Sequence, residues 1–231
     1  MSQQRKTDHM YPWIDRKRNF IGGRCLHECV YCYVERFKKR WAPVRARYSG
    51  EPRLLEQELK KSEGSRHTVF VQDCGDLFAK GIPAEWIVKV LDHLNHYPDN
   101  QYLLQNKNPE RFSEFIGFFP PITILGTTLE SNKNYPVSKA PEIQSRVQGI
   151  QTMRANSYQV MVSVEPIFDF DLDEFLQQLK QIKQLFISIG ADSKGHDLPE
   201  PPAEKIEILI YELEKYTEVK RKSNLQRLMG N

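Results

Sequence analysis

The feature that most constrains the fold of this chain is the alternation of short apolar segments with longer segments of helical periodicity. The short segments are rich in β-branched and large apolar side chains, as strands buried on both faces of a parallel sheet are. Five of them are clear: Thr68–Gln72, Gln101–Gln105, Thr123–Thr127, Gln159–Val164 and Gln184–Ile189. A weaker strand is predicted around Asn19–Gly23, so we expect six strands in all.

The segments between and after the strands predict helices that connect parallel strands. They are Pro83–His96, Pro109–Phe119, Pro141–Arg154, Asp171–Ile182 and Pro202–Val219. Four of them begin with proline and have glutamate close by, a combination suited to the first turn of a helix. Alternating strands and helices predict right-handed βαβ units in an α/β fold. Six units are too few to close an eight-stranded barrel.

Composition agrees with one globular domain over residues 1–231, with an N-terminal extension over 1–17 and a basic tail over 220–231. Hydrophobic residues make up 39% and charged residues 27% of the chain, and the net charge is only +3. No apolar run has the 18 or more residues typical of a membrane span. The polar start, MSQQRKTDHMYPW, does not resemble a secretory signal, so we expect a cytoplasmic protein with reduced thiols.

Three cysteines, Cys25, Cys29 and Cys32, lie within eight residues. A [4Fe-4S] cluster usually takes four thiolates, so three closely spaced ones predict a cluster with one iron open to another ligand. A zinc site is an alternative, with His27 or Cys74 as its fourth ligand, because structural zinc takes four ligands in a tetrahedron. Cysteines that merely pack in the core are a third interpretation.

The spacing CxxxCxxC, with the aromatic Tyr31 just before the last cysteine, resembles the signature of radical S-adenosylmethionine (SAM) enzymes. The segments CYVER, DLF, LLQNKNPERF, ILGTTLESN, VSVEPIF and SIGADS further resemble a phage-associated, radical SAM-like family of unknown substrate, distantly similar to spore photoproduct lyase. The resemblance implies a partial (β/α)6 TIM-like barrel, a [4Fe-4S] cluster and SAM on its open iron. It also implies an electron donor such as flavodoxin or ferredoxin.

Polar residues follow the predicted strands, where a parallel sheet places its ligands. By resemblance, Asp73, Gly75 and Asp76 lie where the SAM amino group binds, and Lys107 lies where its carboxylate binds. Residues after the next two strands offer hydrogen bonds to the ribose: Thr128, Glu130, Ser163 and Glu165. Gly190 would let adenine approach the backbone. Polar residues also gather at strand ends simply because those ends meet solvent.

Cys74 and two basic segments complete the candidates. A thiol at the barrel mouth could donate a hydrogen atom to a substrate radical, as a cysteine does in spore photoproduct lyase, although buried packing is the usual role of a free cysteine. Six basic residues lie between Arg36 and Arg47 among several aromatic residues, and Lys220, Arg221, Lys222 and Arg227 lie near the C-terminus. These segments predict either solvated surfaces or a grip on a nucleic-acid substrate. A zinc- or cluster-bearing nucleic-acid-binding protein without catalysis is therefore the alternative function.

Overall fold

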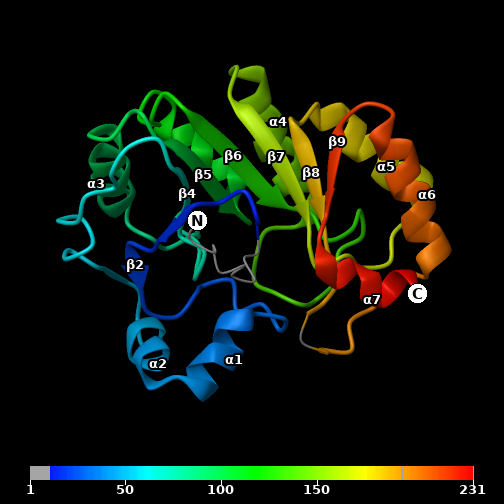
Figure 1. Ribbon diagram of the computed structural model, residues 1–231, viewed down its shortest axis with the longest axis horizontal. Coiled ribbons are helices and arrows are strands. Elements are labelled where there is room, and N and C mark those ends of the chain that lie inside the picture. The colour runs from blue at the N-terminus through cyan, green and yellow to red at the C-terminus, as the bar shows by residue number, and fades with distance from the viewer. Residues whose placement is uncertain (1–10, 194, 231) are drawn as a thin grey trace, which may run out of the picture.

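The computed structural model describes residues 11–193 and 195–230, and its main element is one seven-stranded sheet (Figure 1). In spatial order the strands are β1 (Arg16–Arg18), β4 (Thr68–Val71), β5 (Gln101–Asn106), β6 (Thr123–Thr128), β7 (Gln159–Val164), β8 (Phe186–Ile189) and β9 (Glu218–Arg221). All six pairings are parallel. Because β1 and β9 are the two ends of this order, the sheet is an open, partial barrel, which confirms the predicted α/β class.

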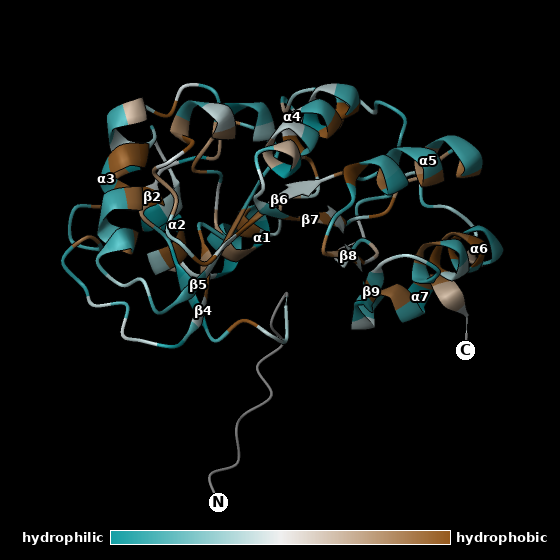
Figure 2. Ribbon diagram, turned by 90° about the horizontal axis from the view of Figure 1, so that it is seen from above, coloured by the Kyte–Doolittle hydropathy of each residue, from teal (hydrophilic) through white to brown (hydrophobic). Residues whose placement is uncertain are grey.

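Helices cover the outer side of the sheet. Seen from above, they form an arc around the strands (Figure 2). They are α3 (Ala84–Asn95), the 3-10 helix η1 (Pro109–Phe115), α4 (Ile143–Ala155), α5 (Leu172–Ile182) and α6 (Ala203–Glu214). Each helix buries an apolar stripe against the strands, and the larger hydrophobic core lies between the two layers. The helices that connect the strands leave the carboxyl ends of the strands free to form a site.

The inner side of the barrel is filled by a second apolar cluster: Tyr11, Ile14, Phe70, Leu103, Ile124, Met161 and Phe186, with Trp13 packed against it. The segment just before β1 therefore seals the inside of the incomplete barrel. Above this cluster, one register row across β6 to β9 is polar and consists of Thr128, Ser163, Ser188 and Lys220. The barrel interior thus changes from apolar to polar toward the carboxyl ends of the strands.

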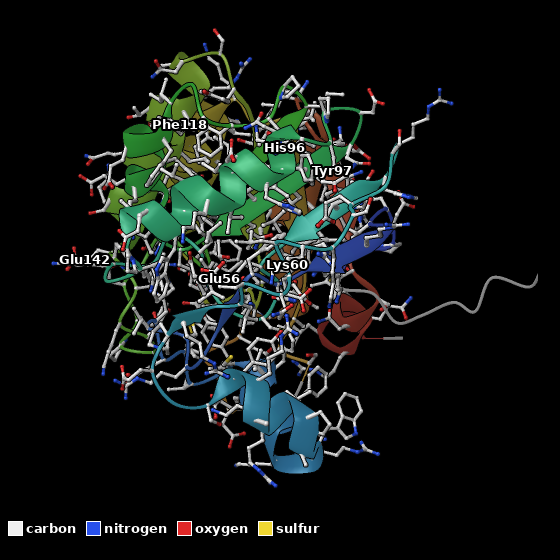
Figure 3. The ribbon with its side chains drawn as sticks, turned by 90° about the vertical axis from the view of Figure 1, so that its left-hand side faces the viewer. Glu56, Lys60, His96, Tyr97, Phe118 and Glu142 are labelled. Atoms are coloured by element: carbon white, nitrogen blue, oxygen red, sulfur yellow. The ribbon has the colours of Figure 1, made fainter. Side chains whose placement is uncertain are left out.

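A small lobe lies beside these carboxyl ends. It contains the short antiparallel pair β2 (Ile21–Gly22) and β3 (Arg53–Leu54) and the helices α1 (Tyr33–Arg40) and α2 (Ala42–Tyr48). Figures 1 and 3 show α1 and α2 projecting from the body of the molecule. The chain ends in the 3-10 helix η2 (Ser223–Leu225) and the short α7 (Gln226–Met229).

The first strand differs from its prediction. Within Asn19–Gly23 only Ile21 and Gly22 form a strand, and they pair with β3 rather than with the large sheet. The sheet begins instead with β1, whose cationic side chains form ion pairs: Lys17 with Asp73 at 3.1 Å and Arg18 with Glu63 at 2.8 Å. An edge strand held by ion pairs lacks the apolar pattern that marks a central strand.

The predicted C-terminal helix is also wrong in its length. It ends at Glu214, and residues 218–221 form β9 instead. The segment predicted as a helix over Pro109–Phe119 is a 3-10 helix that ends at Phe115. Residues assigned to the N-terminal extension and to the C-terminal tail therefore contribute to β1 and β9; residues 1–10 of that extension lie outside the described residues. Among the described residues, no helix is long and apolar enough to span a membrane.

Candidate active site

A cavity of about 1040 Å³ lies at the carboxyl ends of the strands, between them and the cysteine loop. Eleven of the predicted site residues line it: Cys25, Cys29, Tyr31, Cys32, Asp73, Gly75, Asp76, Lys107, Thr128, Ser163 and Glu165. Three others do not line it: Cys74, Glu130 and Gly190. The topology therefore brings together side chains that the sequence spreads over some 140 residues.

The cysteine loop is fixed by backbone hydrogen bonds to the segment that follows β6. The Val30 amide donates to the Val137 carbonyl at 2.9 Å, and the Lys139 amide donates to the His27 carbonyl at 2.7 Å. Cys32 is the N-cap residue of α1, and its amide donates to the Cys29 carbonyl at 3.0 Å. The loop is thus held at its middle and at its C-terminal end, and its three cysteines line the cavity.

The three thiols suit a group that carries positive charge. Burial first, and then the Asp76 carboxylate, raise the pKa of Cys25 to about 12, and burial also raises the pKa of Cys29 and of Cys32. Negative charge on Cys29 or Cys32 would raise the pKa of Cys25 further, so the thiols are close enough to interact. Coordinated metal overcomes both effects, because it deprotonates a thiol outright.

Three thiols that line one cavity are the donor set that a [4Fe-4S] cluster with one open iron would take. In the described part of the chain, no three His, Cys, Asp or Glu side chains converge to hold one metal ion. In an iron-sulfur cube each thiolate ligates a different iron, so its ligands surround a volume instead of meeting at a point. Both candidates for a fourth zinc ligand are engaged elsewhere: His27 with Asp76, and Cys74 with Tyr33.

Asp76 holds three neighbouring segments together. Its Oδ2 atom is 2.8 Å from His27 Nε2 and accepts a hydrogen bond from the Lys107 amide at 2.7 Å, while its Oδ1 atom accepts one from the Phe78 amide at 2.8 Å. Asp76 is 7% exposed. A buried carboxylate with three hydrogen bonds is well satisfied. It connects the cysteine loop, the loop after β4 and the end of β5.

Lys107 and Glu130 form the charged centre of the site. Lys107 Nζ lies 2.6 Å from Glu130 Oε1 and 5.2 Å from the centre of the Tyr31 ring, and the Tyr31 hydroxyl also donates to Glu130 Oε1. Behind them, Arg146 Nη1 pairs with Glu130 Oε2 at 2.8 Å. Burial alone would raise the pKa of Glu130, but the charges of Lys107 and Arg146 lower it to about 2. Glu130 therefore holds Lys107 and Tyr31 beside the cysteines from behind the cavity wall.

The polar register row above the apolar cluster borders the same cavity. Gln105 Nε2 donates to Thr128 Oγ1 at 3.1 Å, and the Tyr11 hydroxyl donates to Gln105 Oε1 at 2.7 Å and to Ser163 Oγ at 3.1 Å. Ser188 Oγ lies in the same row and is buried, and it has no hydrogen-bond partner among the residues that the structure describes. A buried, unsatisfied hydroxyl in a cavity wall is a place where a ligand atom would gain a partner.

Glu165 is fixed by the C-terminal segment. Lys222 Nζ donates to Glu165 Oε2, and Asn224 Nδ2 lies 3.3 Å from Glu165 Oε1. Gly190 lies directly behind this group, because a Cβ atom there would come within 2.9 Å of both Asn224 Oδ1 and Glu165 Oε1. The structure thus gives Gly190 a packing requirement that involves two cavity residues. Lys222 is itself nearly buried, and burial lowers its pKa.

Cys74 does not line the cavity, although its neighbours Asp73 and Gly75 do. Its thiol is 3.9 Å from the Tyr33 hydroxyl, and its backbone amide donates a hydrogen bond to Asn19 Oδ1 at 2.8 Å. Burial, followed by the nearby Asp73 carboxylate, raises the pKa of Cys74 to about 12.

Sequence reasoning missed three further residues near the site, which are Tyr11, Arg146 and Ser188. It assigned Lys222 to a basic C-terminal segment, whereas the structure pairs Lys222 with Glu165 in the site. Tyr11 and Ser163 are 152 positions apart, and Lys222 and Glu165 are 57 apart. Only Ser188 carried a usable signal, since it lies in a strand that the sequence did predict.

Comparison with known proteins identifies the fold. A model of the family described as "Protein of unknown function (DUF5131)" matches residues 12–196. None of the curated proteins matches the chain. A cysteine-to-serine variant of spore photoproduct lyase has a TM-score of 0.65 at 10% identity, over 96% of this chain and 80% of that one.

Two ligand-bound structures are similar as well. One is a spore photoproduct lyase variant with AdoMet and dinucleoside spore photoproduct, at a TM-score of 0.56 and 10% identity, over 86% of this chain and 60% of that one. The other is Streptococcus suis SuiB bound to S-adenosylmethionine, at 0.54 and 6%, over 90% of this chain and 50% of that one. The present chain thus spans half to four fifths of these proteins. At such low identities the similarity is one of fold.

Proposed function

The chain belongs to the DUF5131 family of proteins of unknown function, and from its fold and its cysteine loop we propose that it is a radical SAM enzyme. The observation that carries this proposal is the position of Cys25, Cys29 and Cys32, which line one cavity at the carboxyl ends of a parallel partial barrel. These three thiols would hold a [4Fe-4S] cluster and leave one iron for SAM. When bound, the cluster supplies the electron that cleaves SAM and so starts hydrogen abstraction from a substrate.

The residues of the chain would bind and orient SAM. Lys107 lines the cavity, and its charge acts on both Cys29 and Cys32, so it would pair with the SAM carboxylate while Glu130 holds it in place. Gly75 and Asp73 border the cavity after β4, where the amino group would bind. Thr128, Ser163 and Glu165 would contact the ribose. Gly190 has no side chain, which lets Glu165 lie close against the backbone at this position. Because Asp76 already accepts three hydrogen bonds, we propose that it positions the cysteine loop and Lys107.

The test is anaerobic reconstitution with iron and sulfide, followed by dithionite and SAM. Iron bound per chain and 5'-deoxyadenosine formed are both measured. We expect both in the wild type, and we expect Cys29→Ala to lose both. Cys74→Ala is the matched control, since Cys74 lies outside the cavity lining and should retain iron. A fully loaded protein that forms no 5'-deoxyadenosine would contradict the proposal.

A non-catalytic, metal-bearing nucleic-acid-binding protein is the second candidate, favoured by the basic helices α1 and α2. The same reconstitution separates the two functions. A colourless protein with one zinc per chain, bound through the same cysteines, would favour the second candidate. Cytoplasmic location, the phage association and an electron donor such as flavodoxin or ferredoxin are further parts of the proposal. SAM cleavage with a reduced flavodoxin or ferredoxin in place of dithionite would test the last of these.

A further inference from the structure

The helices α1 and α2 present a surface that the proposed SAM site does not use. It consists of Arg36, Lys39, Arg40, Trp41 and Arg45, all of which are exposed. We call these five residues the basic–aromatic surface. It begins four residues after Cys32 in the sequence, and Figure 1 shows α1 on the side of the molecule where the strands end.

The cations of this surface are not neutralised by carboxylates. In the described part of the chain, none of its four cationic residues forms an ion pair, whereas the neighbouring Lys38 pairs with Glu35 at 2.8 Å and Arg47 pairs with Glu58 at 3.0 Å. The helix dipole favours cations in a last turn, which accounts for Lys39 and Arg40. It does not account for Arg36 in the first turn. The surface is therefore a local excess of positive charge.

A row of aromatic rings connects this surface with the cavity. The Tyr33 and Phe37 rings are 5.5 Å apart edge to face, and the Phe37 and Trp41 rings are stacked at 5.1 Å. Tyr33 and Phe37 line the cavity, while Trp41 is 49% exposed. Exposing half of an indole ring to solvent does not help the protein to fold. The exposed ring does offer a flat face on which a base could stack.

We propose that the basic–aromatic surface binds a single strand of nucleic acid and directs it to the cavity. Phosphates would pair with the unneutralised cations, and an unpaired base would stack on Trp41. A duplex keeps its bases stacked inside, so it could use only the cations. The cavity volume of about 1040 Å³ is at the upper limit for one small ligand, which leaves room for a nucleotide beside SAM.

Only the entry of a nucleotide into the cavity depends on the proposed radical SAM function; binding to the surface does not. The experiment uses the reconstituted protein and fluorescence anisotropy with a labelled oligothymidylate of about 12 nucleotides, a length within known single-strand sites. The variants are Trp41→Ala, Trp41→Phe and the double variant Arg36→Gln/Arg40→Gln. The matched control is Lys180→Gln/Lys183→Gln, which changes two exposed lysines at the end of α5. Figure 1 shows α5 on the right, away from α1 and α2 at the lower left.

We expect Trp41→Ala to weaken binding about tenfold and Trp41→Phe to restore most of it, because stacking needs only a flat ring. The double arginine variant should lower the slope of log K against log salt concentration by about two, which corresponds to the loss of about two phosphate contacts. The α5 control should bind like the wild type. Cleavage of SAM in the absence of substrate should be the same in the wild type and in every variant. If the wild type binds the oligonucleotide but does not cleave SAM, the proposed function fails and the binding surface stands. Equal binding by wild type, Trp41→Ala and the arginine variant, or equal binding of a duplex, would overturn the inference.

Discussion

His27 Nε2 lies 2.8 Å from Asp76 Oδ2, which ties the middle of the cysteine loop to the loop that follows β4. Both side chains are buried. The contact joins the cysteine loop, which we expect to hold the cluster, to the loop after β4, which we expect to bind the SAM amino group. It makes the position of the thiols depend on a carboxylate 49 residues away.

The first prediction concerns this contact. Asp76→Ala removes the acceptor of three buried hydrogen bonds, so we expect the free energy of unfolding to fall by about 3 kcal/mol. Iron bound after reconstitution should fall as well, because the loop loses its attachment. Urea unfolding and iron analysis measure the two effects. An unchanged stability with weaker SAM binding would instead make Asp76 a simple SAM ligand.

The second prediction concerns pH. The pKa of Glu130 is lowered to about 2 from its ordinary 4.5, so Glu130 stabilises the fold above pH 4.5 and this contribution is lost as pH falls toward 2. It corresponds to about 3 kcal/mol. Glu130→Gln should be destabilised at pH 7 and approach the wild type at pH 2.5, as measured by urea unfolding at both pH values. The control is Glu51→Gln, which removes a surface ion pair with Arg24 and should change stability by less than about 0.5 kcal/mol.

The third prediction compares two serines of one register row. Ser163 Oγ accepts a hydrogen bond from Tyr11, whereas Ser188 Oγ has no partner within residues 11–193 and 195–230. We expect Ser163→Ala to cost about 1 kcal/mol and Ser188→Ala to be neutral or slightly stabilising, because the second variant removes an unsatisfied buried hydroxyl. Thermal unfolding decides between them. If Ser188→Ala is the more destabilised protein, its hydroxyl has a partner that is buried with it.

The fourth prediction concerns Gly190. A methyl group at this position would come within 2.9 Å of Glu165 and Asn224, so Gly190→Ala should cost about 1 to 3 kcal/mol and displace Glu165. Adding Asn224→Ala removes one of the two obstructing atoms and should recover part of the loss. Thermal unfolding and SAM affinity of the single and double variants provide the measurement. A single variant as stable as the wild type would show that Glu165 moves without cost.

The central part of the fold could be predicted from the sequence because its strands are apolar on both faces. The segments predicted for β5 and β7 agree with the structure to within a residue at each end. The edges could not be predicted in the same way. Lys17 and Arg18 in β1 are held by ion pairs with distant carboxylates, and no periodic pattern in RKR or EVKR marks a strand.

The candidate site was predictable where it depends on topology. The residues after each strand had to meet at one edge of a parallel sheet, and Lys107, Thr128 and Ser163 do line the cavity there. The partners that orient them were not predictable, because Arg146 reaches Glu130 from a helix and Tyr11 reaches Ser163 from the start of the chain. Such contacts depend on side-chain direction in the folded protein.

The charged composition of β1 and β9 has a consequence for how copies of this protein meet. An open sheet leaves two strands whose outer backbone groups could pair with another molecule and begin a fibre. Here both of these strands carry lysine and arginine, from Arg16 to Arg18 and at Lys220 and Arg221. Pairing through either edge would take these charged side chains and their ion-pair partners out of water, which disfavours the contact. The composition of its two edges therefore disfavours growth of the incomplete barrel into a continuous sheet.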